Sequence, residues 1–189
     1  MSSRPALFLD RDGVLMEDTG YISCPSDVAL IDGVGEALAR MTEAHLFIVV
    51  VTNQSGIGRG YFSENDYRAV HQELLRQLAH YGAHIHATYY CPAAPPNDHP
   101  WRKPAPGMLL TAAQQHQLSL PASIMIGDKA SDLQAGRRAG CRHTALVRTG
   151  QGAATEQSLC DDNAPTHIFD TLPSATDWVL EVLARKPVP

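Results

Sequence analysis

The sequence predicts an α/β protein in which helices cover both faces of a doubly wound, mainly parallel sheet. Short apolar runs typical of buried strands alternate along the chain with longer segments that repeat apolar residues at helical spacing. This alternation requires right-handed crossovers, which place a helix between consecutive parallel strands. Several of the apolar runs also end in polar clusters, as expected where the carboxyl ends of parallel strands form a binding edge.

Six short apolar segments are the expected strands. The first, Ala6–Leu9, runs directly into polar residues and shows no alternation, which favours a strand buried on both faces. The run 46–51 is the clearest strand, since every residue in it is apolar. The other expected strands are 85–90, 123–126, 144–147 and the short segment 168–169.

Five segments are the expected helices. Ser63 is a typical N-cap with Asp66 three residues later, and residues 67–81 then repeat apolar side chains at helical spacing. His71 falls on this apolar stripe, where a packed core histidine is a commoner interpretation than a ligand. The other expected helices are 35–45, 107–117, 131–139 and 172–184.

The polar stretch 14–32 is too short for a separate domain and is expected to form a flap beside the first strand.

The composition is that of one soluble domain. The chain has 189 residues, a formal net charge of −5, and 44% apolar and 19% charged residues. We expect a single domain over residues 1–189, with its core at about 6–185 and a loose C-terminal tail. The charge balance does not favour nucleic acid as a partner, and no segment approaches the length of a membrane span. Residues 1–5 contain no apolar signal region before the first strand.

The cysteines show no C-x-x-C spacing, so we expect free thiols in a reducing cytoplasm. They are Cys24, Cys91, Cys141 and Cys160.

Two carboxylates, Asp10 and Asp12, follow the first strand and precede Gly13. Carboxylates this close repel each other unless a cation lies between them. Mg²⁺ suits such a site, because it is commonly held by one or two carboxylates with waters and phosphate oxygens. An aspartate held by a metal can also act as a nucleophile and become an aspartyl-phosphate. The motif alone is equally typical of a strand-end turn with solvated aspartates.

Polar residues in three later loops are placed to join these carboxylates. Thr52 and Asn53 follow the second strand, although they could instead form a cap or turn. Arg102 and Lys103 lie in a proline-rich loop and could be a solvated surface. Asp128 follows the fourth strand and could be the N-cap of the next helix. Together these loops supply a hydroxyl, an amide, a cation and a further acid, which are the groups that phosphoryl transfer needs.

These motifs, in this order, resemble the haloacid dehalogenase-like hydrolase superfamily. The resemblance covers about residues 6–150 and rests on Asp10-x-Asp12-Gly13, Thr52, Lys103, and Gly127-Asp128 with Asp132. It implies a Rossmann-like haloacid dehalogenase fold without a large cap domain, because only one helix and strand fill each gap between motifs. The resemblance is closer to the subgroup of heptose-bisphosphate and histidinol-phosphate phosphatases. The stretches that carry it are 8–13, 50–60, 89–92, 102–108 and 127–132.

The resemblance implies a role for each of these side chains. Asp10 would attack phosphorus, and Asp12 would protonate the leaving alcohol and then deprotonate water. Asp10, the backbone carbonyl of Asp12, and Asp128 would hold Mg²⁺. Thr52 and Lys103 would grip the transferring phosphoryl group. The expected substrate contacts are Asp18, Thr19, Gly20, Tyr21, Asn53, Gln54, Ser55, Arg59, Arg102 and Lys129, with Asn53 on the phosphoryl group.

The expected function is Mg²⁺-dependent hydrolysis of a sugar bisphosphate, as the resemblance implies. D-glycero-D-manno-heptose 1,7-bisphosphate, cleaved at the 7-phosphate, is the leading substrate, since Arg102 and Lys129 suit a second phosphate. Histidinol phosphate is the alternative substrate, and a non-catalytic phosphate-binding protein on the same fold is the alternative class. We expect a cytoplasmic monomer whose partner is a small sugar phosphate, with no nucleic acid or membrane involved.

One loop departs from the subgroup's pattern. Most members have a C-x-H…C-x-C zinc loop before the Arg-Lys pair. Here Cys91 is present, but Ala93 stands where the pattern has its histidine, and no Cys-x-Cys precedes Arg102. Cys91 and His99 alone cannot complete a four-ligand structural site. We therefore expect a shorter loop without zinc, held by prolines whose fixed φ lowers its entropy. These prolines are Pro92, Pro95, Pro96 and Pro100.

Overall fold

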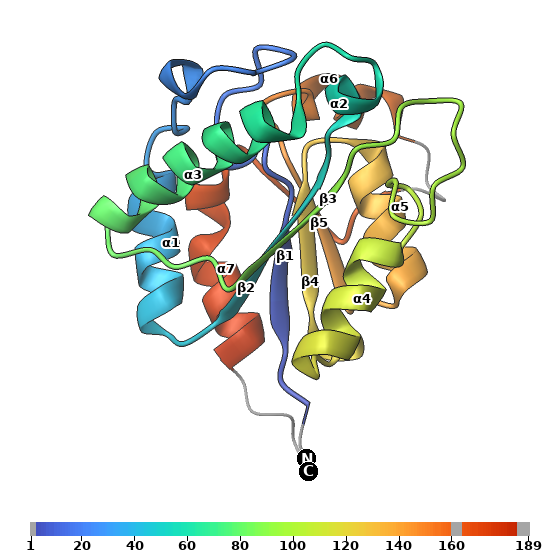
Figure 1. The fold of residues 1–189 in the computed structure, drawn as a ribbon. Coiled ribbons are helices and arrows are strands. Elements are labelled where there is room, and N and C mark those ends of the chain that lie inside the picture. Colours follow the sequence, from blue (N-terminus) through green and yellow to red (C-terminus); the bar gives the residue numbers. More distant parts are fainter. Residues whose placement is uncertain (1–2, 160–163, 185–189) are drawn as a thin grey trace.

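The computed structural model describes residues 3–159 and 164–184 and contains a six-stranded parallel sheet (Figure 1). The sheet order is β3-β2-β1-β4-β5-β6, and every neighbouring pair is parallel. The predicted doubly wound α/β class is therefore confirmed. The strands are β1 (Ala6–Leu9), β2 (Phe47–Asn53), β3 (Ala87–Cys91), β4 (Ile124–Gly127), β5 (His143–Val147) and β6 (His167–Phe169).

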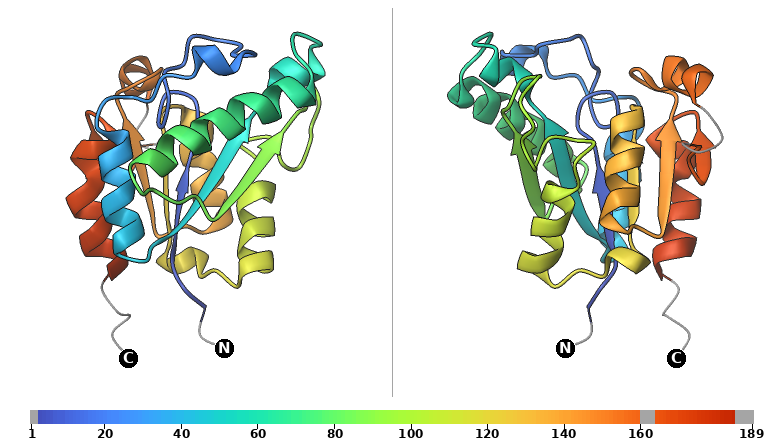
Figure 2. Two further views of the ribbon diagram at one scale, coloured as in Figure 1. Left: turned by 60° about the vertical axis from the view of Figure 1, so that its left-hand side comes forward. Right: turned by 90° about the vertical axis from the view of Figure 1, so that its right-hand side faces the viewer.

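Helices cover both faces of this sheet, as Figures 1 and 2 show. One face packs against α1, α3 and α7, and the other packs against α4 and α5. The helices are α1 (Val34–Glu43), α2 (Ser55–Gly58), α3 (Glu64–His80), α4 (Gly107–His116), α5 (Ala130–Ala139), α6 (Gly152–Ser158) and α7 (Leu172–Ala184). Two short 3-10 turns, Pro25–Asp27 and Leu120–Ala122, complete the elements.

The core explains why the central strands are apolar throughout. Leu7 and Leu9 of β1 belong to the hydrophobic cluster under α1, α3 and α7. Phe8, between them, points to the opposite cluster under α4 and α5. Successive strand side chains point to opposite faces, so a strand covered on both sides needs apolar residues at every position. All four residues of β1 are fully buried.

The start of α3 has the predicted capping box. The Ser63 hydroxyl accepts a hydrogen bond from the Asp66 backbone N–H (3.2 Å), and the Asp66 carboxylate accepts one from the Ser63 N–H (2.8 Å). Further along this helix, His71 stacks on Tyr67 with ring centroids 5.9 Å apart. Burial, and then the nearby Arg11 charge, lower the pKa of His71 to about 4, so it is a neutral packed side chain at pH 7.

Some element boundaries differ from those predicted. The third strand begins at Ala87 and not at Ile85, because the His86 ring nitrogen and not a backbone carbonyl accepts the hydrogen bond of the Ile48 N–H (3.2 Å). Thr52 and Asn53 lie inside β2 and not after it. The N-cap of α5 is Lys129, so Asp128 does not cap this helix. The short helices α2 and α6 were not predicted, since segments of this length carry little periodicity.

Among the residues that the structure describes, no helix has the length and apolar character needed to cross a membrane. Cys24, Cys91 and Cys141 are free thiols. The expectations for Cys160 and for the tail 185–189 lie outside the described residues.

Candidate active site

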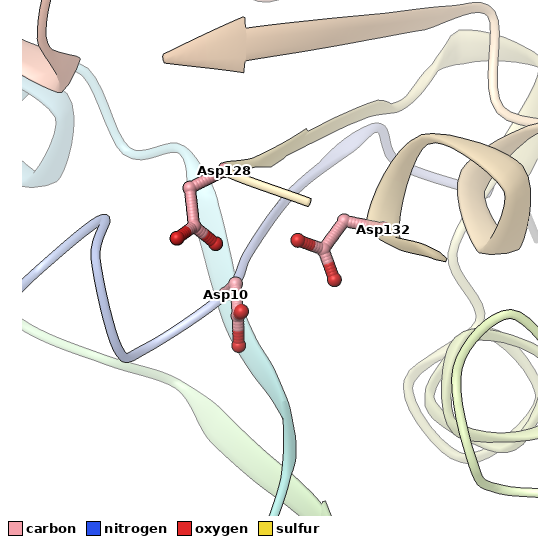
Figure 3. Close-up of side chains that lie close together, drawn as sticks. All are labelled: Asp10, Asp128 and Asp132. Carbon is pink, nitrogen blue, oxygen red and sulfur yellow. The ribbon is translucent and has the colours of Figure 1, made fainter. Parts of the chain in front are cut away.

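The predicted catalytic residues meet at the carboxyl ends of β1 and β4. The chain runs outward through β1, β2 and β3 and returns to β4 on the other side of β1, so this is the point where the strand order reverses. Asp10 follows β1 directly, and its N–H donates to the Ile126 carbonyl of β4 (3.0 Å). Asp128 follows β4, and Asp132 comes from the first turn of α5. The three carboxylates lie close together, each offering an oxygen within 4.8 Å of the others (Figure 3).

Lys103 is buried between two of these carboxylates. Its Nζ lies 2.9 Å from Asp10 Oδ1 and 2.7 Å from Asp132 Oδ1, and it donates to the Val51 carbonyl at 2.8 Å. Burial alone would lower the pKa of Lys103, but attraction to Asp10 and Asp132 raises it above its ordinary value. Lys103 therefore stays a cation beside the Asp10 carboxylate.

Asp128 has the properties of a ligand for a hard cation. Its Oδ1 is buried and has no hydrogen-bond partner among the described residues, whereas its Oδ2 accepts the Gln151 N–H (2.9 Å). Burial and then the charge of Asp10 raise the pKa of Asp128 to about 7. A divalent cation would remove both the repulsion and the unsatisfied oxygen. The residues present thus fit Mg²⁺.

Asp132 has a different part in this cluster from Asp10 and Asp128. Lys103 engages its Oδ1, and the Lys129 N–H donates to its Oδ2 (3.0 Å). Asp10 accepts a hydrogen bond from the Arg11 N–H (2.8 Å) and forms an ion pair with Lys103. Both contacts use Oδ1 of Asp10, which leaves its Oδ2 for a cation. Asp10 and Asp128 are therefore the better pair of metal ligands, and Asp132 fixes Lys103.

Two glycines keep the backbone close to Asp128. Gly13 and Gly150 both have positive φ, at +83° and +57°. A Cβ on either residue would lie 2.3 or 2.4 Å from Asp128 Oδ2, well inside van der Waals contact. Only residues without a side chain fit both the backbone conformation and the space here.

Asp12 is held from two sides at the edge of the cluster. Arg11 donates to its Oδ1 through Nε (3.1 Å) and Nη2 (2.8 Å). Gln54 donates to its Oδ2 through Nε2 (2.8 Å), and the Thr52 hydroxyl lies 3.4 Å from the same oxygen. Both carboxylate oxygens of Asp12 thus have donors in place.

Asn53 connects β2 to the proline-rich loop. Its Nδ2 donates to the Lys103 carbonyl, and its Oδ1 accepts the Lys103 N–H, both at 3.0 Å. This reciprocal pair places the Lys103 backbone, and so its ammonium, beside Asp10. The sequence predicted that Asn53 contacts the phosphoryl group. Asn53 lines the cavity, a position that is compatible with this contact as well as with holding the Lys103 backbone.

A cavity of about 310 Å³ opens next to Asp12 and contains most of the predicted substrate contacts. Lys129 lines this cavity, and its Nζ lies 3.0 Å from Asp18 Oδ2. This ion pair connects the flap to the loop after β4. Tyr21 lines the cavity and meets the Tyr61 ring edge to face, with ring centroids 4.6 Å apart. The predicted residues that line the cavity are Asp12, Asp18, Gly20, Tyr21, Asn53, Gln54, Ser55 and Lys129.

Three predicted substrate contacts do not line this cavity. Thr19 is exposed between two residues that do, and Arg59 is exposed at the end of α2. Arg102 donates from Nη1 to the Ala93 carbonyl (2.8 Å) and lines a second cavity of about 460 Å³ beside Arg138.

The sequence interpretation missed the residues that follow β5. Gln151 donates its N–H to Asp128 Oδ2, and the Thr155 hydroxyl donates to the Asp128 carbonyl (2.8 Å). The Thr149 hydroxyl donates to the Gly13 carbonyl (2.6 Å). The available signal was positional: a loop after another parallel strand must end at the same edge of the sheet. Arg11 was also missed, because a charged residue between two aspartates does not suggest burial.

Comparisons with known proteins agree with this geometry. Residues 100–175 match the HAD-hydrolase-like family model. A D-glycero-D-manno-heptose-1,7-bisphosphate 7-phosphatase of Thermosynechococcus vestitus is 42% identical over 97% of this chain and 99% of its own. The D-glycero-beta-D-manno-heptose-1,7-bisphosphate 7-phosphatase of Escherichia coli K12 is 36% identical over 98% and 93%.

The solved structures include a D,D-heptose 1,7-bisphosphate phosphatase from B. bronchiseptica complexed with magnesium and phosphate. It matches with a TM-score of 0.87 and 33% identity, over 94% of this chain and 98% of its own. The sheet order, the carboxylate cluster and the buried lysine define the class of HAD-like hydrolases. Within this class, the chain belongs to the heptose-1,7-bisphosphate 7-phosphatase family.

Proposed function

We propose that the protein is a Mg²⁺-dependent phosphatase that removes the 7-phosphate of D-glycero-D-manno-heptose 1,7-bisphosphate. The observation that carries the chemistry is Asp10 beside Lys103 and opposite the unsatisfied Oδ1 of Asp128. The relatives in T. vestitus and E. coli, whose names give this activity, support the substrate.

In the proposed reaction, a carboxylate oxygen of Asp10 attacks the phosphorus atom. The bond from phosphorus to the sugar oxygen breaks, and Asp12 gives its proton to that oxygen as the alcohol leaves. Asp12 then takes a proton from a water molecule, which attacks the aspartyl-phosphate. This second step releases inorganic phosphate and restores Asp10 as a carboxylate.

Other side chains stabilise the charge that develops on the phosphoryl oxygens. Lys103 supplies a positive charge beside Asp10, and the Thr52 hydroxyl supplies a hydrogen-bond donor. Asp10, Asp128 and the Asp12 backbone carbonyl would hold Mg²⁺. When bound, Mg²⁺ neutralises the carboxylates and the phosphate oxygens so that the anions can approach each other.

We also propose that one chain makes the complete site and that the enzyme works as a cytoplasmic monomer. Each strand end that contributes a catalytic group belongs to the same sheet, so the geometry calls on no second copy. Light scattering with size exclusion should give the mass of one chain of 20.5 kDa, and a dimer would contradict the proposal.

The test is phosphate release with Mg²⁺ on three substrates: heptose 1,7-bisphosphate, histidinol phosphate and fructose 1,6-bisphosphate. We expect the highest kcat/KM on heptose bisphosphate, and loss of at least ~10³ in kcat for a folded Asp10→Asn variant. Histidinol phosphate as the best substrate would overturn the assigned substrate. Turnover by Asp10→Asn near that of the wild type would overturn the covalent mechanism.

A further inference from the structure

Arg11 is the largest fully buried side chain of the described residues, with 1% of its surface exposed. It stands between Asp10 and Asp12 in the chain, two residues past the end of β1. Burying a guanidinium is unfavourable unless it is paired with a good partner. A side chain in this position therefore needs an explanation that the fold alone does not supply.

The charged partner of Arg11 is Asp12. Nε and Nη2 both point at Asp12 Oδ1, at 3.1 and 2.8 Å. Gln54 holds the other oxygen, so donors from two elements fix the carboxylate in one orientation. The Asp12 side chain is 13% exposed, and it lies at the wall of the cavity.

The far side of the guanidinium rests on α3. The Arg11 guanidinium carbon lies 5.3 Å from the centre of the Tyr67 ring, and Nη1 has no hydrogen-bond partner among the described residues. Tyr67 is in turn packed against Tyr90, with ring centroids 4.3 Å apart. Arg11 thus cannot swing away from Asp12 without opening the core under α3.

We propose that Arg11 is a positioning residue, which holds the acid–base carboxylate Asp12 in place for the leaving group and for water. This inference rests on the proposed function. A carboxyl group that is already oriented loses less entropy when it transfers a proton in the transition state. Arg11 need not touch the substrate for this role, because the contact it makes is with Asp12.

The proposal predicts that the effect of Arg11 depends on the leaving group. A sugar alkoxide must be protonated as it leaves, so the first step on heptose bisphosphate needs a correctly oriented Asp12. The p-nitrophenolate ion is a stable anion and leaves p-nitrophenyl phosphate without a proton. General acid catalysis is worth about 10²–10⁴ in rate, so a misplaced acid should affect one substrate far more than the other.

The experiment is a single-turnover measurement with the full-length enzyme in excess and Mg²⁺ present. Quench-flow release of the heptose monophosphate and optical release of p-nitrophenolate each report only the first step. In Arg11→Met, which keeps the length of the side chain and loses the donors, we expect the sugar step to slow by about 10²-fold. Release of p-nitrophenolate should change by less than about threefold, within the effect of a small local rearrangement.

Two further variants make the result decisive. Arg11→Lys keeps the charge and loses the two-pronged donor, so it should give a smaller loss with the same dependence on the leaving group. It also replaces Arg11→Met if that variant does not fold. Arg40→Met makes the same chemical change at an exposed ion pair on α1 and should leave both rates unchanged.

Equal losses on both substrates would overturn the positioning role and indicate that Arg11 only supports the fold. A rise in KM with an unchanged sugar step would indicate a substrate contact instead. A wild-type enzyme that is inactive on both substrates would contradict the proposed function itself. Failure of the proposed function can therefore be distinguished from failure of the positioning role of Arg11.

Discussion

Lys103 Nζ lies 2.7 Å from Asp132 Oδ1, and neither side chain meets solvent. Asp132 comes from α5 and Lys103 from the proline-rich loop, so this pair joins two elements under the nucleophile. It also keeps a charged ammonium beside Asp10 in a buried place.

Replacement of Lys103 by Met should remove activity and lower the free energy of unfolding by about 3–5 kcal/mol, because it leaves buried carboxylates without their cation. Urea unfolding measures the stability. The double variant Lys103→Met with Asp132→Asn removes one of the two carboxylate charges that Lys103 compensates and leaves that of Asp10, so it should regain part of the stability and none of the activity. No recovery in the double variant would show that the pair does not carry this stability.

Gly150→Ala should weaken Mg²⁺ binding by about 10- to 100-fold, since its Cβ would displace Asp128 Oδ2. The readout is the rise in Tm that Mg²⁺ produces by binding the folded state. Gly140→Ala is the matched control: its φ of +86° gives similar backbone strain, and no atom of the described residues lies within 4 Å of the added Cβ. Equal loss of the Mg²⁺-dependent shift in both variants would contradict the role of Gly150.

Lys129 should determine the preference for a bisphosphate, because it is the predicted cation that lines the cavity at Asp12. Lys129→Ala should lower kcat/KM on heptose bisphosphate by about tenfold to a hundredfold, and less on histidinol phosphate, since a charge-assisted contact is worth about 1.5–3 kcal/mol. Arg102 is bonded to the Ala93 carbonyl and lines the other cavity, so Arg102→Ala should lower both values alike. A loss restricted to the bisphosphate in Arg102→Ala would instead support the role assigned from the sequence.

The purified protein should contain no stoichiometric zinc, and a chelator should not lower its Tm in the presence of Mg²⁺. In the loop after β3, Cys91 Sγ lies 3.6 Å from His99 Nδ1, which already accepts the Trp101 N–H (3.1 Å). Burial raises the pKa of Cys91, which disfavours the thiolate that zinc needs. Elemental analysis that finds one zinc per chain would refute this prediction.

His71 should make the stability depend on pH. Its folded pKa of about 4 lies below the ordinary 6.5, so the unfolded chain binds more protons between these values. The free energy of unfolding should therefore rise as pH increases from about 4 to 6.5 and level off above. Urea unfolding at pH 5 and pH 7 should show a smaller difference in His71→Gln than in the wild type. His80→Gln, at an exposed site on α3, retains His71 and should keep the difference.

The fold and most of the site could be predicted from the sequence for identifiable reasons. Buried parallel strands are apolar at every position, so β1 and β2 were recognisable, and the carboxyl ends of such strands meet at one edge. The helix α6 could not be predicted in this way, because its seven residues bury little apolar surface. The burial of Arg11 could not be predicted either, since it depends on Tyr67 of α3, far away in the chain. The position of Arg102 depends on how the proline-rich loop folds back on Ala93, which no local pattern indicates.

The central position of β1 has a consequence for synthesis of the protein. The strand pairs with β2 on one side and with β4 on the other, and about 70 residues separate the end of β2 from the start of β4. At about 5–20 residues per second, one edge of this apolar strand lacks its partner for roughly 4–14 s on the ribosome. Such an edge can pair with other chains, so we expect nascent chains to need chaperones most while α3, β3 and α4 are being made. Asp128 emerges directly after β4, so the metal site is complete only once this exposed interval has ended.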